Sequence, residues 1–366
     1  RRASAPGQAC LRARLQPVVL IALTGLTGLT GLAGLAGLAG LVGIAGCGRG
    51  PALPAVGGTE EICLVSDLPA ADPRRAGARA LLEAPVPTVR DEPRFQVREA
   101  GPGELDAVRH YRCLVLLLDA ARPGEMRRLL GRALGSADRR ALADATSDYR
   151  IVRDVWSRAQ VVLVLHAAGA APAPDWLEPG GPALLERLEE ALLAALGDAS
   201  LAAGEDAELS RALAVRYGFS LRVPAGYRAR EDAAGRVVRL ARLGDGEPPR
   251  FLLVHWGPAR SAPSTPDGLL ALRDSLGNAW HDGDRVLLER SQAGPGLFQS
   301  RPATVLHGVY QNERYAYGGP FRAVAFTRGE RFYLLDASVF HPSGRKLPYL
   351  REVLALAQSF RVEESS

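Results

Sequence analysis

Two continuous apolar runs constrain the fold of this chain more than any other feature. Residues 113–118 and 161–165 contain no polar side chain apart from a cysteine. Runs this short, without alternation, are typical of strands buried on both faces of a sheet. A helical pattern follows each run, at 123–135 and at 182–196, and Gly197 is expected to end the second helix. The first half is therefore predicted to alternate strands and helices around a buried sheet.

The second half has a different pattern, with several strand-like runs and few helices between them. These runs are 219–223, 251–256, 286–289, 305–310, 321–326 and 333–339, and a closing helix is expected over 346–358. Neighbouring strands without helical crossovers indicate mostly antiparallel pairing. The predicted fold class is α+β, with two α/β-type halves, mixed to mostly antiparallel sheets and packed helices. A similar strand–helix order in the two halves leaves a duplication of one α/β unit as an alternative.

The first 47 residues predict where the protein is located. Four arginines within the first 14 residues precede an uncharged apolar run, which ends in Ala45-Gly46-Cys47. A basic start, an apolar stretch and small residues at a cleavage site indicate a secretory signal. The form that ends in cysteine resembles the signal peptides of bacterial lipoproteins, which implies cleavage after Gly46 and a lipid on the Cys47 thiol. An uncleaved transmembrane anchor is the alternative, because about 20 apolar residues can span a bilayer.

This signal divides the chain. We expect a signal peptide over 1–46 and a flexible tether over 47–58, which is rich in Gly, Pro and Ala. An N-terminal α/β domain over 59–204 and a C-terminal α+β domain over 205–366 are expected to follow. The predicted location is the cell envelope, with the body facing the periplasm or the exterior and membrane lipid as a partner through Cys47.

Charge and cysteine content narrow the function classes. Lys and Arg number 45; without the four signal arginines 41 remain, against 40 acidic residues. No polybasic block exists, so nucleic acid is excluded as a partner. Cys63 and Cys113 lie in apolar runs and are predicted to be small buried side chains, with a disulfide between them as the alternative.

An aromatic and glycine-rich segment is the candidate ligand loop. The glycines permit backbone torsions that other residues avoid, the proline stiffens the exit, and the rings offer flat faces to a glycan or peptide. The alternative is a tight turn between antiparallel strands with packed aromatic rings. The candidate residues are Tyr310, Tyr315, Tyr317, Gly318, Gly319, Pro320 and Phe321.

Other motifs give weaker signals. Ser343 and Lys346 match the Ser-x-x-Lys pattern of penicillin-recognising enzymes, but Lys346 is the only lysine, so the Lys-Thr-Gly strand of that site cannot exist. Ser343 is instead predicted to cap the closing helix. Four histidines near strand ends are expected to lie in turns or interfaces, with a shared metal site as a weak alternative. These are His166, His255, His307 and His341. No metal, cofactor or catalytic residue is predicted.

A succession of short motifs carries a family resemblance. The motifs are Asp91-Glu92-Pro93-Arg94-Phe95, Asp154-Val155-Trp156-Ser157-Arg158-Ala159-Gln160, Tyr217 to Tyr227, Gly318-Gly319-Pro320-Phe321 and Arg345-Lys346. Over residues 60–361 the chain resembles an uncharacterised group of bacterial lipoproteins, the domain-of-unknown-function family 4837. Where that family tends to have Arg-Gly-Leu-Trp, this chain reads His307-Gly308-Val309-Tyr310. The C-terminal half is also similar to domains of the PsbP/Mog1 type.

The resemblance implies a location and a fold but no activity. Together with the lack of a complete catalytic set, it predicts a non-catalytic binding or scaffolding protein of the bacterial cell envelope. The partner would be an envelope protein or a glycan. The alternative is an envelope hydrolase that acts on a cell-wall or peptide substrate.

Overall fold

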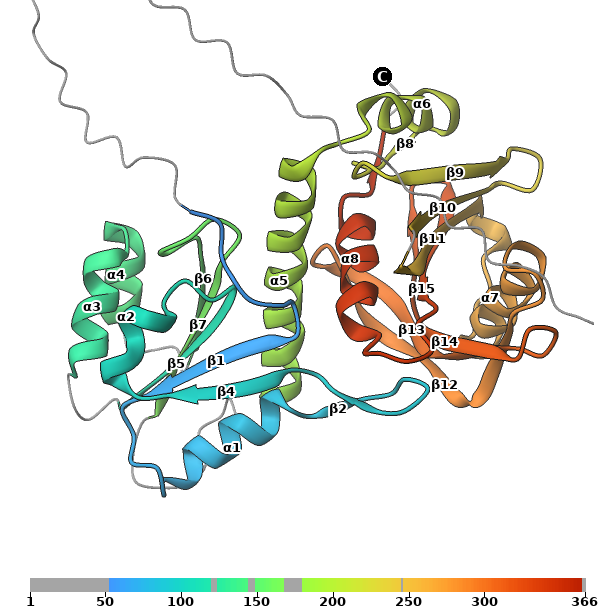
Figure 1. Ribbon diagram of the computed structural model, residues 1–366. Helices are drawn as coiled ribbons and strands as arrows, with labels where there is room; N and C mark the ends of the chain where they lie inside the picture. Colours follow the sequence, from blue (N-terminus) through green and yellow to red (C-terminus); the bar gives the residue numbers. More distant parts are fainter. Residues whose placement is uncertain (1–52, 120–123, 144–148, 168–179, 245, 364–366) are drawn as a thin grey trace, which may run out of the picture. The chain divides into compact units, whose positions relative to one another are not determined.

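The computed structural model describes residues 53–119, 124–143, 149–167, 180–244 and 246–363 (Figure 1). The predicted signal peptide, Gly46, Cys47 and the first part of the predicted tether lie outside these residues. Gly50–Ser366 forms one compact unit. No helix in the described ranges is both long enough and apolar enough to cross a membrane.

The first half builds a mainly parallel five-stranded sheet in the order β4-β1-β5-β7-β6, in which only β6 is antiparallel to its neighbour. Its strands are β1 (Glu61–Ser66), β4 (Gln96–Ala100), β5 (Cys113–Asp119), β6 (Tyr149–Arg153) and β7 (Val161–Ala167). The helices of this half are α1 (Pro73–Leu82), α2 (Leu105–Val108), α3 (Glu125–Ala133) and α4 (Ser136–Ala143), with η1 (Pro102–Glu104) before α2. Between α1 and β4 the chain forms a small antiparallel hairpin. Its strands, β2 (Pro85–Val86) and β3 (Glu92–Pro93), are two residues long each.

The apolar runs predicted as buried strands are the centre of this sheet. Side chains on one face of β1, β5 and β7 pack with α2 and α3, and those on the other face pack with α1 and α5 (Gly181–Ala203). Burial on both faces explains why these strands are apolar without alternation.

The second half builds an antiparallel seven-stranded sheet in the order β12-β13-β14-β15-β11-β10-β9. Its strands are β9 (Tyr227–Asp232), β10 (Val237–Gly244), β11 (Glu247–Pro258), β12 (Arg285–Phe298), β13 (Arg301–Asn312), β14 (Tyr317–Arg328) and β15 (Arg331–Val339). The remaining elements are α6 (Ala207–Tyr217), α7 (Pro266–Trp280), α8 (Leu347–Gln358), η2 (Ala259–Ser261) and the short pair β8 (Phe219–Ser220) and β16 (Arg361–Val362). The fold class is α+β, as predicted.

Helices α5 and α8 pack against each other (Figure 1). One continuous hydrophobic core joins them to a face of each sheet. Gly197 does not end α5, which continues to Ala203. A Cβ added at Gly197 would lie 3.6 Å from the carbonyl oxygen of Ala355 in α8. This glycine therefore sits where the two helices approach closely, which a sequence pattern cannot reveal.

The structure settles two further expectations. Cys63 and Cys113 are fully buried free thiols, as predicted, and the alternative disulfide is wrong. Cys63 is opposite Leu114 in the register, so the two cysteines point to opposite faces of the sheet and belong to different core clusters. The duplication alternative is also wrong, because residues 113–118 lie in a parallel sheet and 251–256 in an antiparallel one.

Candidate functional site

The predicted ligand loop lies mainly within two paired strands. Tyr310 is in β13, Tyr315 is in the turn, and the residues from Tyr317 to Phe321 are in β14. Gly319 is opposite Tyr310 and Gly318 is opposite Gln311 in the antiparallel register. Pro320 and Phe321 are opposite Val309 and Gly308.

The two glycines are needed for close packing. A Cβ at Gly319 would lie 2.0 Å from the carbonyl oxygen of Val339, and one at Gly318 would lie 2.5 Å from that of Tyr310. The Tyr310 hydroxyl donates to the Val339 carbonyl at 3.0 Å and so occupies the space above Gly319. Only Tyr315, with 52% of its surface exposed, and the half-buried Tyr317 and Gly318 present accessible surface to a glycan or peptide. A ligand role for this segment therefore rests on these three residues.

The buried rings of this segment enclose an arginine. Arg273 of α7 lies with its guanidinium carbon 4.1 Å from the ring centre of Phe321 and 5.4 Å from that of Tyr310. Its Nε donates to Asp336 at 3.1 Å, and both side chains are at most 1% exposed. Burial raises the pKa of Asp336, although the Arg273 charge opposes that rise. This pair is closed to solvent and connects α7 to β15 of the sheet.

A second carboxylate lies beside this pair. Burial raises the pKa of Asp284 to about 6, against the lowering effect of its hydrogen bond from Asn312 Nδ2 at 2.9 Å. Burial also lowers the pKa of the neighbouring His281 to about 3. The sequence His281-Asp282-Gly283-Asp284 forms a turn, with positive φ at Asp282 and Gly283. The turn thus places a buried titratable group next to Arg273.

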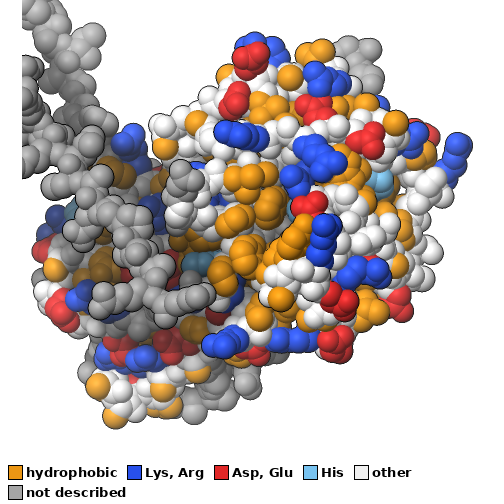
Figure 2. Space-filling view, turned by 45° about the vertical axis from the view of Figure 1, so that its right-hand side comes forward, with side chains coloured by type: hydrophobic (Ala, Val, Ile, Leu, Met, Phe, Trp, Pro, Cys, Tyr) orange, Lys and Arg blue, Asp and Glu red, His pale blue; other side chains and the backbone are white. Residues whose placement is uncertain are grey.

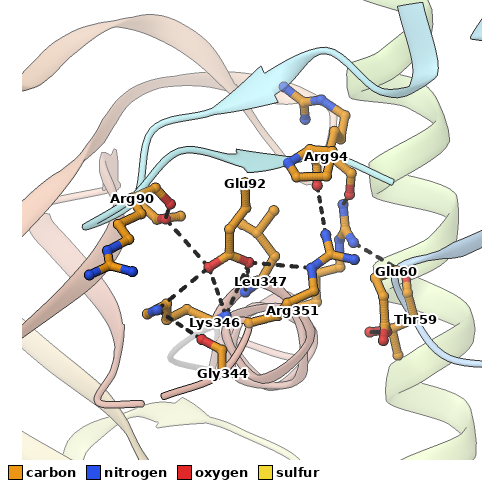
Figure 3. Close-up of polar contacts among 12 residues, drawn as sticks. Thr59, Glu60, Arg90, Glu92, Arg94, Gly344, Lys346, Leu347 and Arg351 are labelled. Atoms are coloured by element: carbon orange, nitrogen blue, oxygen red, sulfur yellow. Dashed lines mark hydrogen bonds and ion pairs between the residues drawn. The ribbon is translucent and has the colours of Figure 1, made fainter. Parts of the chain in front are cut away.

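The closing helix is capped from a distant part of the chain (Figure 3). The carboxylate of Glu92 in β3 accepts hydrogen bonds from the backbone N–H of Lys346 at 2.9 Å and of Leu347 at 3.3 Å. The prediction that Ser343 caps this helix is wrong, because α8 begins at Leu347 with Lys346 as its N-cap residue. A carboxylate at a helix N-terminus satisfies free N–H groups and complements the helix dipole.

A buried ion network continues from this cap along α8. Arg351 donates to Glu189 of α5 at 3.1 Å and to the Arg94 carbonyl at 3.0 Å. Burial alone would raise the pKa of Glu189, but the charges of Arg351, Arg322 and Arg94 lower it to about 2. These contacts join α5, α8 and the segment after β3. They are enclosed, so their role is structural.

A further cluster of titratable groups lies at the carboxyl edge of the parallel sheet. After β1 the chain forms β4 on one side, and it then forms β5 on the other side of β1. Ligands of open α/β sheets bind at such switch points, outside the carboxyl ends of the strands. Asp67 directly follows β1 and Asp119 ends β5, so both carboxylates lie at this edge. His166 lies near the carboxyl end of the next strand, β7.

The groups of this edge contact one another. The Asp119 N–H donates to Asp67 Oδ1 at 2.6 Å. Burial raises the pKa of the half-buried Asp67, and the Asp119 charge adds to that rise, while Arg127 opposes it. Arg127 Nη2 lies 3.2 Å from His166 Nδ1, and its buried Nε has no hydrogen-bond partner among the described residues. Arg74 of α1 donates to the Ala167 carbonyl at 3.3 Å. The edge thus brings carboxylates, guanidinium groups and an imidazole together.

Sequence reasoning noticed His166 but missed both aspartates. The available signal was an acidic residue directly after each buried apolar strand. The four histidines considered together have separate neighbours: His255 contacts the Arg236 carbonyl, His307 contacts Gln292, and His341 packs on Tyr349. Within the described ranges, no group of three His, Cys, Asp or Glu side chains could hold a metal ion.

Exposed apolar side chains form a second kind of candidate surface. Figure 2 shows hydrophobic side chains gathered near the centre of one face, with Lys, Arg, Asp and Glu around them. Leu288 and Leu297, both in the edge strand β12, are 64% and 60% exposed. An edge strand with exposed leucines is suited to contact with another protein.

The fold and these sites define an α+β protein in which a mainly parallel sheet and an antiparallel sheet share one core. Residues 206–359 match the family model described as Domain of unknown function (DUF4837), in agreement with the resemblance seen in the sequence. Comparison with curated proteins gives no significant match.

Solved structures give only distant likenesses. A crystal structure from Bacteroides thetaiotaomicron VPI-5482 is 14% identical over 41% of this chain, with a TM-score of 0.27, and the match spans 46% of that protein. The lipid transfer and protein localization domain of human StarD13 (DLC2) is 11% identical over 42% of this chain and 95% of its own length, with a TM-score of 0.16. Ara h 8.0201 is 8% identical over 30% of this chain and 99% of its own length, with a TM-score of 0.13. TM-scores this low carry no information on function.

Proposed function

We propose that this protein is a lipid-anchored, extracytoplasmic lipoprotein of the bacterial cell envelope, whose folded body binds or scaffolds a partner without catalysis of its own. The observation that carries the proposal is the apolar run that ends in Ala45-Gly46-Cys47 after a basic start. The described fold begins at residue 53, a few residues after Cys47. A lipid on Cys47 would therefore hold the body close to the membrane surface.

Radioactive palmitate tests the anchor. Cells that produce the protein with Cys47→Ala are expected to yield unlabelled protein, whereas the wild type is labelled and stays with the membrane fraction. Several acyl chains at about 0.8 kcal/mol per buried CH₂ hold a protein far more firmly than one chain does. Cys10→Ala is the matched control, because it removes a cysteine from the signal but leaves the attachment site. Label that persists in the Cys47→Ala variant would refute the anchor.

The carboxyl edge of the parallel sheet is the proposed ligand site of the folded body. Supporting this are its place at the topological switch point and its mixture of hydrogen-bond donors and acceptors around Asp67, Asp119, Arg74 and Arg127. A muropeptide, with hydroxyl, carboxylate and amide groups, suits such a mixture. Glycan fragments of the cell wall are therefore the first ligand class to test.

Calorimetric titration with purified muropeptides tests this site. The wild type is expected to bind them, and Asp67→Asn is expected to weaken binding while the thermal midpoint is kept. Asp91→Asn is the control, because Asp91 has 58% of its side chain exposed and does not belong to the edge. Equal affinity in all three proteins would exclude the edge as the site.

One observation favours the second candidate function, an envelope hydrolase. The pKa of Asp67 is raised next to a second carboxylate, which is typical of a general acid paired with an ionised partner. The same muropeptides, followed by mass spectrometry, separate the two candidates. Cleavage that is lost in Asp67→Asn and kept in Asp91→Asn supports the hydrolase. Binding without cleavage supports the non-catalytic function.

A further inference from the structure

We propose that a groove at one end of the antiparallel sheet binds a ligand that carries phosphate. This arginine groove is a depression of about 360 Å³, within the size range of ligand pockets. It lies between the β9–β10 turn, the end of β11 with η2, and the start of β15. Its lining residues are Arg236, Trp256, Gly257, Pro258, Arg260, Glu330 and Arg331. The groove is distinct from the carboxyl edge of the parallel sheet, so this inference does not depend on the proposed function.

Backbone geometry places Arg236 and Arg331 at the groove. Arg236 has a positive φ of 54° in the β9–β10 turn, and its carbonyl accepts the Trp256 N–H at 3.2 Å. A Cβ at Gly257 would lie 4.0 Å from Arg236 Nη1, so the guanidinium group extends over this glycine. Arg331 Nη1 donates to the Tyr217 carbonyl at 2.7 Å, which fixes its guanidinium at another side of the groove.

The charge in the groove is not balanced. Three arginines and one acidic residue, Glu330, line the groove. In the part of the chain that the structure describes, Arg236 and Arg260 have no side-chain hydrogen bond or ion pair, and the partner of Arg331 is a neutral carbonyl. Elsewhere in the described ranges, many arginines are paired with Asp or Glu, as Arg222 is with Glu205. A groove with this excess of positive charge attracts anions.

The chemistry of the groove suits phosphate. Guanidinium groups donate pairs of parallel hydrogen bonds that match the oxygen atoms of phosphate, and several guanidinium groups can share its charge. Trp256 at the base of the groove is buried, with its ring centre 4.8 Å from that of Tyr217 and 5.2 Å from that of Phe219, so it anchors the groove to the core. A soluble phosphorylated molecule and a phospholipid headgroup share this chemistry.

Titration with two probes tests the groove and distinguishes these sources. Inorganic pyrophosphate represents the soluble anion, and phosphatidylglycerol vesicles, compared with phosphatidylcholine vesicles, represent the headgroup. The protein used is the full body from residue 47 onward. We expect at least one probe to bind, and the variant Arg236→Gln/Arg260→Gln to bind at least about tenfold more weakly, because two charge-assisted contacts are lost.

A matched variant controls for net charge. Arg228→Gln/Arg314→Gln also removes two arginines, neither of which lines the groove, and is expected to change affinity by less than about twofold in 0.15 M salt. Pyrophosphate binding alone would identify a soluble ligand, and binding of phosphatidylglycerol vesicles alone would identify a lipid headgroup. The proposal is overturned if the wild type binds neither probe, or if the two double variants weaken binding equally.

Discussion

Glu92 is predicted to be the carboxylate on which the attachment of the closing helix most depends. It belongs to the hairpin of the first half, yet it accepts the first N–H groups of α8 in the second half (Figure 3). It is only 8% exposed, and Lys346 Nζ and Arg345 Nε lie 4.0 Å and 3.6 Å from its carboxylate. Truncation of this side chain should therefore loosen α8 as well as the hairpin.

The expected loss follows from these contacts. Removal of a helix cap costs about 0.5–2 kcal/mol. A buried donor left without a partner costs about 1–3 kcal/mol. Glu92→Ala removes the cap of two N–H groups in a site that water reaches poorly, so we expect the free energy of unfolding to fall by about 2–4 kcal/mol. Glu92→Gln keeps one acceptor oxygen and should lose about half as much.

Urea unfolding followed by circular dichroism measures these values. Asp91→Ala is the matched control, because this adjacent carboxylate has 58% of its side chain exposed and only a surface ion pair to Arg290. Its removal is expected to cost less than about 1 kcal/mol. If Glu92→Ala costs no more than Asp91→Ala, the cap does not stabilise α8 and the reasoning is refuted.

Three further predictions concern buried groups. Arg273→Met leaves the Asp336 carboxylate buried and unpaired, so the free energy of unfolding measured in urea should fall by about 3–5 kcal/mol. Arg273→Met/Asp336→Leu should lose less. A double variant as unstable as the sum of both single variants would contradict this. Burial raises the pKa of Asp284 from 3.8 to about 6, so the folded state holds this proton more tightly than the unfolded chain, and stability should fall as pH rises between these values. Thermal melts of Asp284→Asn should lack this part of the pH dependence. A pH profile of the variant identical to that of the wild type would contradict the prediction. Burial raises the pKa of Cys63 to about 11 and of Cys113 to about 12, so neither thiol should react with Ellman's reagent at pH 8 until urea unfolds the protein. Rapid labelling of either thiol in the folded protein would contradict this prediction.

Local pattern predicted most of the regular structure. The apolar runs at 113–118 and 161–165 became the central strands β5 and β7, and the runs of the second half became an antiparallel sheet. These predictions were confirmed because burial on one or both faces of a strand determines the order of apolar and polar side chains along it. The expected strand at 219–223 is shorter, and only Phe219–Ser220 pairs, with β16.

Contacts between distant residues escaped prediction. The cap of α8 comes from Glu92, 254 residues before Lys346, and no local signal connects them. The lack of a side chain at Gly319 leaves space for the Tyr310 hydroxyl and the Val339 carbonyl. The residues around Gly319 in the sequence predicted a ligand loop instead. The aspartates at the carboxyl edge became a site only once strand order was known.

The sequence by itself determined the α+β class, the buried strands and the similarity of residues 206–359 to a family model, because side-chain polarity and short motifs are local properties. Tertiary structure alone decided which charges are paired, which carboxylates meet at the switch point and which arginines line a common groove. Such pairings depend on the register of strands and the packing of helices, and these are fixed only when the whole core closes.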